Sequence, residues 1–190
     1  MSIDPVGNHG PSGHDPQLGV EPVRIDGHLI DKYLSDFPTA GDDVHFANPQ
    51  IEQYREEILS AYHATGIPPE IIAAQMWHES RGDMSTASTN IDGSQDVGLM
   101  QIGQARADEY LHHFGASGSL DVQNPADNIM AGAIELKYWL QQSGGDLRGA
   151  LNGYVSGNLN GNGPGDPNYA TNCLNYIDLI RQGQPLPDQD

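Results

Sequence analysis

Apolar residues recur at helical spacing along most of the chain beyond residue 48. The first such stretch begins at Asn48-Pro49, where the asparagine can cap a helix and the proline fits its first turn, and it ends at Gly66. Similar boundary residues and apolar spacing predict further helices over about 68–82, 104–114, 124–142, 146–156 and 167–182. The pattern therefore predicts a predominantly helical domain.

Residues 83–102 interrupt this helical pattern. They contain two short β-like segments on either side of Asp92-Gly93, a dipeptide typical of hairpin turns. The predicted fold class is α+β, mostly helical, with one small β-hairpin inserted between the second and third helices.

The N-terminal quarter of the chain has a different pattern. Residues 1–47 keep neither a helical nor a strand period, and Pro and Gly recur in their first half, so they bury too little apolar surface to offset the entropy of ordering. A short apolar patch between Leu29 and Phe37 can form one or two helical turns that dock on the domain. We therefore divide the chain into a mostly disordered or loosely docked segment over 1–47, a folded domain over 48–184 and a flexible tail over 185–190.

Composition and charge argue against several classes of protein. Twenty-six Asp and Glu against eight Lys and Arg give the 190 residues a net charge of −18, whereas binding to nucleic acids or anionic membrane surfaces needs a basic face. No apolar run approaches the roughly 18 residues that span a bilayer. The single cysteine, Cys173, cannot form an internal disulfide, and no Cys/His cluster has zinc-binding spacing. We predict a monomer with no metal, no cofactor, no nucleic-acid partner and no membrane insertion.

Two carboxylates are the strongest candidates for chemistry. Glu79 lies at the end of a strongly apolar helix, and burial among apolar neighbours disfavours its charged form, which is what a general acid for glycosidic cleavage requires. Asp96 follows 17 residues later, just beyond the predicted turn, which can bring it opposite Glu79. Taken alone, a Glu at a helix end is usually solvated or capping, and an Asp beside a hairpin usually stabilises the turn. Two carboxylates that face one cleft are the standard equipment of glycoside hydrolysis.

Four motifs, in order, resemble those of the lytic transglycosylase (soluble-transglycosylase-like) family. They are Glu79-Ser80, Gly98-Leu99-Met100-Gln101-Ile102, Asn124-Pro125-Ala126-Asp127-Asn128-Ile129 with Gly132, and Ala150-Leu151-Asn152-Gly153-Tyr154-Val155-Ser156-Gly157. Their order and spacing match over about residues 50–182. The resemblance implies a lysozyme-like catalytic domain that cleaves the β-1,4 bond between N-acetylmuramic acid and N-acetylglucosamine in the glycan strands of peptidoglycan.

The resemblance also implies roles for single residues. Glu79 would be the general acid that protonates the leaving oxygen, and then the base for attack by the muramic C6 hydroxyl, which gives a 1,6-anhydro product without water. Ser88 falls where the family often has a serine near the acetamido group. Met100 and Gln101 match substrate-contacting positions, and Tyr154 matches a tyrosine that hydrogen-bonds near the catalytic glutamate.

A second resemblance concerns the hairpin. Asp92-Gly93-Ser94-Gln95-Asp96-Val97-Gly98 is similar to the active-site hairpin of c-type lysozymes, and the spacing from Glu79 to Asp96 also fits. This leaves open a muramidase, in which Asp96 is the nucleophile or charge stabiliser and water completes the reaction. Val155 replaces the asparagine that the family has after the tyrosine. That departure leaves open an inactive wall-binding assembly factor, although the other motif residues are present.

A wall enzyme must reach its substrate across a membrane. No basic patch followed by an apolar stretch marks a Sec-type signal peptide at the N-terminus, and some small enzymes that serve specialised secretion systems are similar to this chain in carrying a carboxylate at the position of Asp96. We therefore expect a periplasmic or secreted location, reached by type III-type secretion, within a phage virion or after removal of a leader, with secretion-apparatus or virion components as partners. The negative charge indicates local, tethered action on the anionic wall, since charge mainly sets encounter rates.

Overall fold

The structure is a computed structural model that describes residue 25 and residues 28–90 and 92–188. Residues 1–24, 26 and 27 of the segment that we predicted to be mostly disordered or loosely docked lie outside the described residues. Within the described ranges the chain forms eight α-helices, one short 3-10 helix and one two-stranded antiparallel sheet. The predicted class, a mostly helical α+β fold with a small hairpin, is confirmed.

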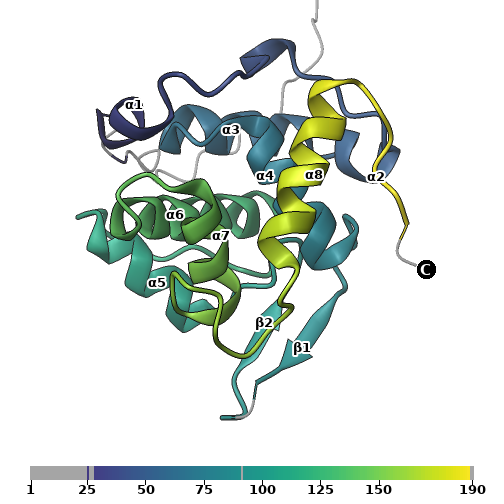
Figure 1. The fold of residues 1–190 in the computed structure, drawn as a ribbon. Coiled ribbons are helices and arrows are strands. Elements are labelled where there is room, and N and C mark those ends of the chain that lie inside the picture. Colours follow the sequence, from purple (N-terminus) through teal and green to yellow (C-terminus); the bar gives the residue numbers. More distant parts are fainter. Residues whose placement is uncertain (1–24, 26–27, 91, 189–190) are drawn as a thin grey trace, which may run out of the picture.

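The hairpin lies between the fourth and fifth helices (Figure 1). The elements are α1 (His28–Leu34), η1 (Gly41–Asp43), α2 (Pro49–Glu52), α3 (Arg55–Thr65), α4 (Pro69–Ser80), β1 (Ala87–Thr89), β2 (Gln95–Val97), α5 (Gln104–His113), α6 (Pro125–Gln142), α7 (Leu147–Ser156) and α8 (Tyr169–Arg181). The first predicted helix is divided into α2 and α3, because the chain turns at Tyr54, whose φ of −107° and ψ of 18° lie outside the helical range. Ile51 and Ile58, on either side of this turn, are both buried.

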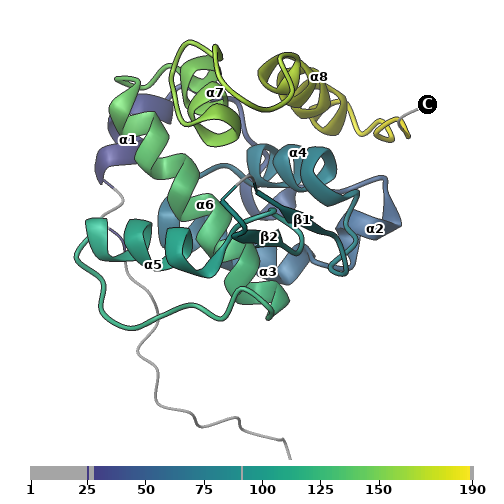
Figure 2. The same ribbon diagram turned by 90° about the horizontal axis from the view of Figure 1, so that it is seen from below.

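α6, which is 18 residues long, lies at the centre of the domain. It packs against α3, α4, α5 and α7, and α8 packs against α4 and α7 (Figure 2). α4 and α6 are buried along most of their lengths, and their side chains, including Ile71, Met76, Trp77, Ile134 and Leu136, belong to the main hydrophobic core. Removal of these large apolar side chains from water is the main source of stability.

The described part of the N-terminal segment lies against the domain. Ile30 of α1, Val44 and Phe46 are buried in the core. Glu70, in the first turn of α4, is buried. Its carboxylate accepts hydrogen bonds from Thr39 Oγ1 at 2.7 Å and from the backbone N–H of Ala40 at 2.6 Å. The segment therefore adds apolar side chains to the core and satisfies a buried carboxylate at the start of α4.

The described residues 186 and 187 also lie against the domain. Leu186 is buried; its N–H donates to Asn48 Oδ1 at 2.7 Å, and its carbonyl oxygen accepts from Asn48 Nδ2 at 3.2 Å. Trp77 Nε1 donates to the carbonyl oxygen of Pro187 at 2.9 Å. Asn48 makes no side-chain cap bond to α2, contrary to our expectation, because its amide group binds the C-terminal segment instead.

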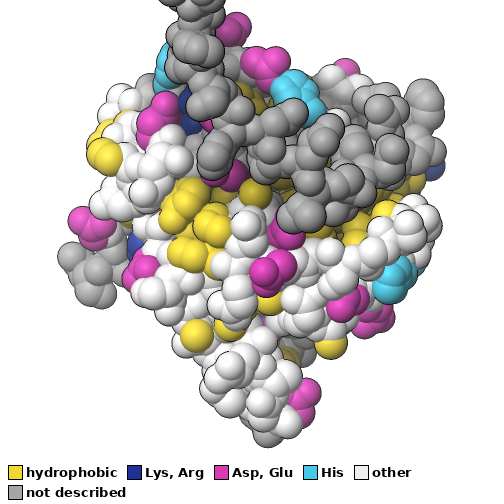
Figure 3. All heavy atoms as spheres, turned by 180° about the vertical axis from the view of Figure 1, so that it is seen from behind, with side chains coloured by type: hydrophobic (Ala, Val, Ile, Leu, Met, Phe, Trp, Pro, Cys, Tyr) yellow, Lys and Arg dark blue, Asp and Glu magenta, His cyan; other side chains and the backbone are white. Residues whose placement is uncertain are grey.

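The surface reflects the acidic composition. On the face opposite to that of Figure 1, acidic side chains are spread over the described surface with fewer basic ones among them (Figure 3). This distribution agrees with the net charge of −18. Over the described ranges, none of the helices combines the length and the hydropathy that crossing a membrane requires.

Candidate functional site

Glu79 lies in the last turn of α4. The hydroxyl of the next residue, Ser80, donates to the carbonyl oxygen of Leu99 at 2.9 Å. Arg81 then takes a left-handed conformation with a φ of 58°, which ends the helix. Ser80 thus joins the end of α4 to the turn that contains residues 98–101, and this contact gives a physical reason for a small hydroxyl residue after Glu79.

The environment of the Glu79 carboxyl suits a general acid. Tyr169, the first residue of α8, donates its hydroxyl proton to Glu79 Oε1 at 2.6 Å, and Gln75 Nε2 donates to the Tyr169 oxygen at 3.4 Å. Burial raises the pKa of Glu79 from 4.5 to about 8, against the lowering effects of the Tyr169 hydrogen bond and the Arg106 charge. A carboxyl group with this pKa keeps its proton at neutral pH.

The turn after β2 is held closely against its neighbours. Gly98 has a φ of +75°, and a Cβ atom there would lie 2.6 Å from Asn128 Nδ2, so the close approach requires glycine. Gln101 also has a positive φ, 46°. Its Nε2 donates to the carbonyl oxygens of Thr86 at 2.9 Å and Gly98 at 3.0 Å. The partly exposed Gln101 side chain therefore joins the turn to the start of the hairpin.

Met100 and Tyr154 lie on the buried side of this turn. The Met100 side chain is fully buried, and a Cβ atom at Gly132 of α6 would lie 2.7 Å from it. We therefore propose a packing role for Met100 in place of substrate contact. Tyr154 of α7 donates its hydroxyl proton to the carbonyl oxygen of Met100 at 2.8 Å. The hydrogen bond to Glu79 itself comes from Tyr169, a residue that the sequence interpretation did not include.

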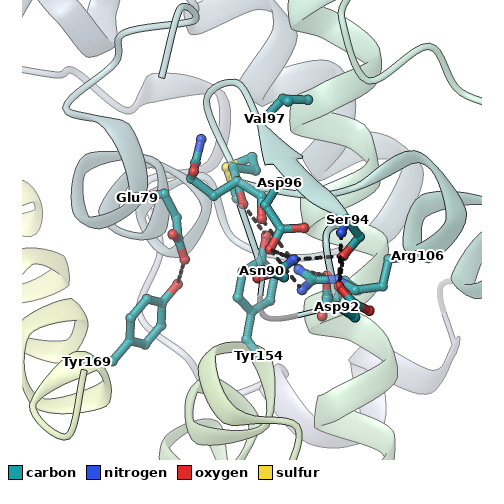
Figure 4. A network of polar contacts seen from close by, with 12 residues as sticks. Glu79, Asn90, Asp92, Ser94, Asp96, Val97, Arg106, Tyr154 and Tyr169 are labelled. Atoms are coloured by element: carbon teal, nitrogen blue, oxygen red, sulfur yellow. Dashed lines mark hydrogen bonds and ion pairs between the residues drawn. The ribbon is translucent and has the colours of Figure 1, made fainter. Parts of the chain in front are cut away.

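The hairpin places Ser88 and Asp96 opposite each other. The two residues are register partners in the antiparallel pair β1–β2, and Ser88 is exposed. Asp96 Oδ2 accepts a hydrogen bond from Asn90 Nδ2 at 3.1 Å and lies 3.6 Å from the Arg106 guanidinium (Figure 4). The Asp96 side chain is 14% exposed.

Arg106 lies beside Asp96 and pairs in turn with Glu135, and the sequence interpretation included neither residue. Arg106 of α5 donates to Glu135 Oε2 at 2.9 Å, and Trp139 Nε1 donates to Glu135 Oε1 at 3.3 Å. Burial raises the pKa of Glu135 to about 7, although the Arg106 charge lowers it. A signal was available, because Glu135 stands directly between the apolar residues Ile134 and Leu136.

Tyr154 lies between Tyr169, which binds Glu79, and Arg106, which pairs with Asp96. Its ring is stacked on that of Tyr169, with centroids 6.3 Å apart, and the Arg106 guanidinium lies 6.0 Å from its centroid on the other side of the site (Figure 4). The negative charge of Asp96 is near enough to raise the pKa of Glu79. Glu79, Asp96 and Tyr154 therefore lie in one region of the domain, where the charges of the two carboxyl groups influence the pKa values of their neighbours.

Val155 has an apolar role in place of the polar one expected from the family pattern. A Cβ atom at Gly165 would lie 2.7 Å from Val155 Cγ2, so the side chain packs closely under the loop that leads from α7 to α8. That loop carries Asp166, whose Oδ2 lies 3.1 Å from His78 Nε2. His78 in turn lies against Tyr169, with ring centroids 4.4 Å apart.

A cavity of about 450 Å³ lies elsewhere, on the side of α1 and α3. Its lining includes Ile30, Phe37 and Tyr62 and none of the candidate site residues Glu79, Ser88, Asp96, Met100, Gln101, Tyr154 and Tyr169. Among the residues that the structure describes, no group of three or more His, Cys, Asp or Glu side chains is arranged to hold a metal ion.

Comparisons with known proteins agree with this geometry. Residues 56–174 match the family model described as the transglycosylase SLT domain, a range that includes Glu79, Asp96, Tyr154 and Tyr169. No curated protein matches the chain. Among solved structures, an inactive mutant of the lytic transglycosylase Slt from Pseudomonas aeruginosa matches with a TM-score of 0.58 and 23% sequence identity. The match covers 74% of this chain but only 26% of the Slt chain, so this protein spans about a quarter of the length of that relative.

Proposed function

Because the chain belongs to the transglycosylase SLT domain family, we propose that it cleaves the β-1,4 bond between N-acetylmuramic acid and N-acetylglucosamine in peptidoglycan. The observation that carries this proposal is the environment of the Glu79 carboxyl. Burial raises its pKa to about 8, and it accepts a hydrogen bond from Tyr169. Such a group can donate a proton to a glycosidic oxygen at neutral pH.

The first step is protonation of the leaving oxygen by Glu79. Because Oε1 accepts the hydrogen bond from Tyr169, the transferable proton resides on Oε2. As the glycosidic bond breaks, positive charge develops at the muramic C1 and its ring oxygen, and the Asp96 carboxylate stabilises it electrostatically. Glu79 is left as a carboxylate.

The second step forms the product. The muramic C6 hydroxyl attacks C1 and gives its proton to the Glu79 carboxylate, so that a 1,6-anhydro ring closes and Glu79 returns to its acid form. No water is consumed. In this proposal, Gln101 and Ser88 lie near the glycan, and Tyr154 fixes the turn that carries Gln101 through its bond to Met100 O.

The products of digestion test this reaction directly. We expect mass spectrometry of purified peptidoglycan digested by the wild-type protein to give muropeptides that end in 1,6-anhydro-N-acetylmuramic acid. The Asp96→Asn variant is expected to give the same products at a rate about 10- to 100-fold lower, because one stabilising charge is lost. Products that carry only reducing ends would contradict the transglycosylase proposal.

A muramidase is the second candidate, and the position of Asp96 favours it. Asp96 of β2 lies beside Arg106. Its negative charge is close enough to Glu79 to contribute to the raised pKa of that group. If Asp96 acts as a nucleophile, water completes the reaction and the product has a reducing end. Loss of these reducing-end products in Asp96→Asn would establish this alternative.

The pH dependence of lysis gives a separate prediction. Glu79 must be protonated to act as an acid, so activity is expected to fall as the pH rises through about 8. Tyr169→Phe removes a hydrogen bond that lowers the pKa of Glu79, and the alkaline limb of the pH–rate profile should therefore move to higher pH. Tyr176→Phe, in the same helix, is the matched control and should leave the profile unchanged. An unmoved limb in Tyr169→Phe would mean that Glu79 does not set it.

We also propose that the protein acts locally on the wall, in the periplasm or outside the cell, during assembly of a secretion apparatus or delivery of an effector. The net charge of −18 supports this proposal, since an acidic protein is repelled by an anionic wall and benefits from a partner that holds it there. The chemistry at Glu79 does not depend on this route.

A further inference from the structure

Three charged side chains from three different elements meet beside the hairpin. Arg106 of α5 pairs with Asp96 of β2 (Figure 4) and also with Glu135 of α6. Its guanidinium is 2.9 Å from Glu135 Oε2 and 3.6 Å from Asp96 Oδ2. The hairpin is thereby joined electrostatically to the central helix of the domain.

The Arg106–Glu135 pair is the fixed part of this cluster. The Glu135 side chain is only 2% exposed, and its other oxygen accepts a hydrogen bond from Trp139 Nε1. A buried carboxylate needs a hydrogen-bonded cation to offset the loss of hydration. Because Arg106 comes from α5, which packs against α6, and Trp139 comes from α6 itself, both oxygens of Glu135 have a partner in this pair of helices.

Asp96 belongs to an element that needs such support. The strands β1 and β2 have three residues each, and all of β1 is exposed. A short two-stranded hairpin is marginally stable without contacts to the rest of a protein. Asn90 Nδ2, the other partner of Asp96 Oδ2, comes from the same hairpin and cannot anchor it to the domain. Arg106 reaches Asp96 from outside the hairpin.

We propose that Arg106, held by Glu135, is a positioning residue that fixes the Asp96 carboxylate beside the bond to be cleaved. This inference rests on the proposed function and adds to it the two residues through which Asp96 is oriented. Arg106 acts through Asp96 and need not contact the glycan. Asp96 stabilises developing charge only if its carboxylate is held at the right distance from C1.

The groups that face Arg106 define its effect on pH dependence. They are Asp96 of β2, Glu135 of α6, Tyr154 of α7, Tyr110 of α5 and, further away, Glu79 of α4. The Arg106 charge lowers the pKa of both Glu79 and Glu135. Loss of this charge should therefore move the alkaline limb of the pH–rate profile upward, an effect that a purely structural residue would not produce.

A double-mutant cycle tests the proposal. Arg106→Gln is expected to lower kcat by about tenfold or more, and by no more than Asp96→Asn does, with a smaller change in KM, since its effect is to displace Asp96. Arg106→Lys, which keeps the charge, should recover part of the loss. In an Asp96→Asn background, Arg106→Gln should cost less than about threefold, because its effect passes through Asp96. Losses that multiply in full would overturn the proposal.

Hydrogen exchange provides a readout that does not depend on activity. Backbone amides of residues 95–97 are expected to exchange about tenfold faster in Arg106→Gln than in the wild type. Arg148→Gln is the matched control, since Arg148 is exposed on α7 and its guanidinium donates to Thr171 Oγ1, away from the hairpin, and it should change neither exchange nor activity. Unchanged exchange in Arg106→Gln would also overturn the proposal.

Two further measurements distinguish a failure of this inference from a failure to fold or a failure of the proposed function. If Arg106→Gln does not fold, the double variant Arg106→Gln/Glu135→Gln removes both charges and leaves no buried carboxylate without its cation; the same losses are expected in it. If the wild-type protein itself releases no glycan fragments, the proposed function fails. The exchange rates of residues 95–97 then still decide whether Arg106 holds Asp96.

Discussion

Replacing Glu79 by Gln is expected to reduce lysis of peptidoglycan by about a thousandfold or more, because the amide has no proton that it can transfer to the glycosidic oxygen. Glutamine keeps the size of the side chain and can still accept the hydrogen bond from Tyr169. The variant should therefore fold and bind purified peptidoglycan as the wild type does. Release of soluble muropeptides and co-sedimentation with insoluble wall measure the two properties separately.

The same substitution has a second expected effect, on stability. The pKa of Glu79 is about 8 in the folded protein, above its unfolded value of 4.5. Between these two pH values the folded state binds more protons than the unfolded state, so the wild type loses stability as the pH rises through this range. Glu79→Gln removes that contribution. Its stability relative to the wild type should increase from pH 5 to pH 8 in denaturant unfolding.

Glu56→Gln is the matched control for both measurements. Glu56 is exposed in the first turn of α3 and belongs to no part of the candidate site. This variant should keep wild-type lysis and the wild-type dependence of stability on pH. A Glu79→Gln protein that folds and keeps wild-type lysis would show that Glu79 is not the general acid. That result would contradict both the transglycosylase and the muramidase proposals.

The fold was largely predictable because its signals are local. Helix α6 begins where Asn124 Oδ1 accepts hydrogen bonds from the N–H groups of Ala126 and Asp127, and α7 begins with the same type of cap at Asp146. Caps, prolines and glycines act within a few residues of their own position. The position of the hairpin between α4 and α5 followed in the same way from Asp92-Gly93.

The site was predictable only in part because its contacts are between distant segments. Glu79 could be selected from its own apolar helix, whereas Tyr169, its hydrogen-bond donor, is 90 residues further along the chain. The family pattern directed attention to Tyr154, whose hydroxyl donates to Met100 O. Which of two tyrosines reaches Glu79 depends on how α7 and α8 pack, and no local pattern specifies that packing.

The cluster at Arg106 was missed for a similar reason. Arg106 and Glu135 lie 29 residues apart on different helices, and each alone reads as a charge on an amphipathic helix. Glu135 differs in being surrounded by apolar neighbours in the sequence. An acidic residue inside an apolar stretch requires a cation, so this was the available clue.

Asn128→Ala is expected to cause a large loss of stability through the contacts that it makes beside the site. Asn128 of α6 is fully buried and makes three hydrogen bonds to backbone groups outside its helix. Its Oδ1 accepts from the N–H of Met100 at 2.8 Å, and its Nδ2 donates to the carbonyl oxygens of Val97 at 3.0 Å and Val122 at 2.9 Å. Alanine leaves these backbone groups without their partners, which costs about 1 kcal/mol or more for each.

The expected total is about 3–5 kcal/mol, or a fall in Tm of about 10 °C in thermal unfolding. Asn124→Ala is the control in the same helix: it removes an ordinary cap at the exposed start of α6 and should cost only about 1 kcal/mol. Because Val97 adjoins Asp96, Asn128→Ala should also lower lysis at temperatures where the protein remains folded. Equal losses of stability in the two variants would show that Asn128 does not secure the 97–101 turn. A larger loss in Asn128→Ala would identify α6 as the support on which the hairpin and the turn are both built.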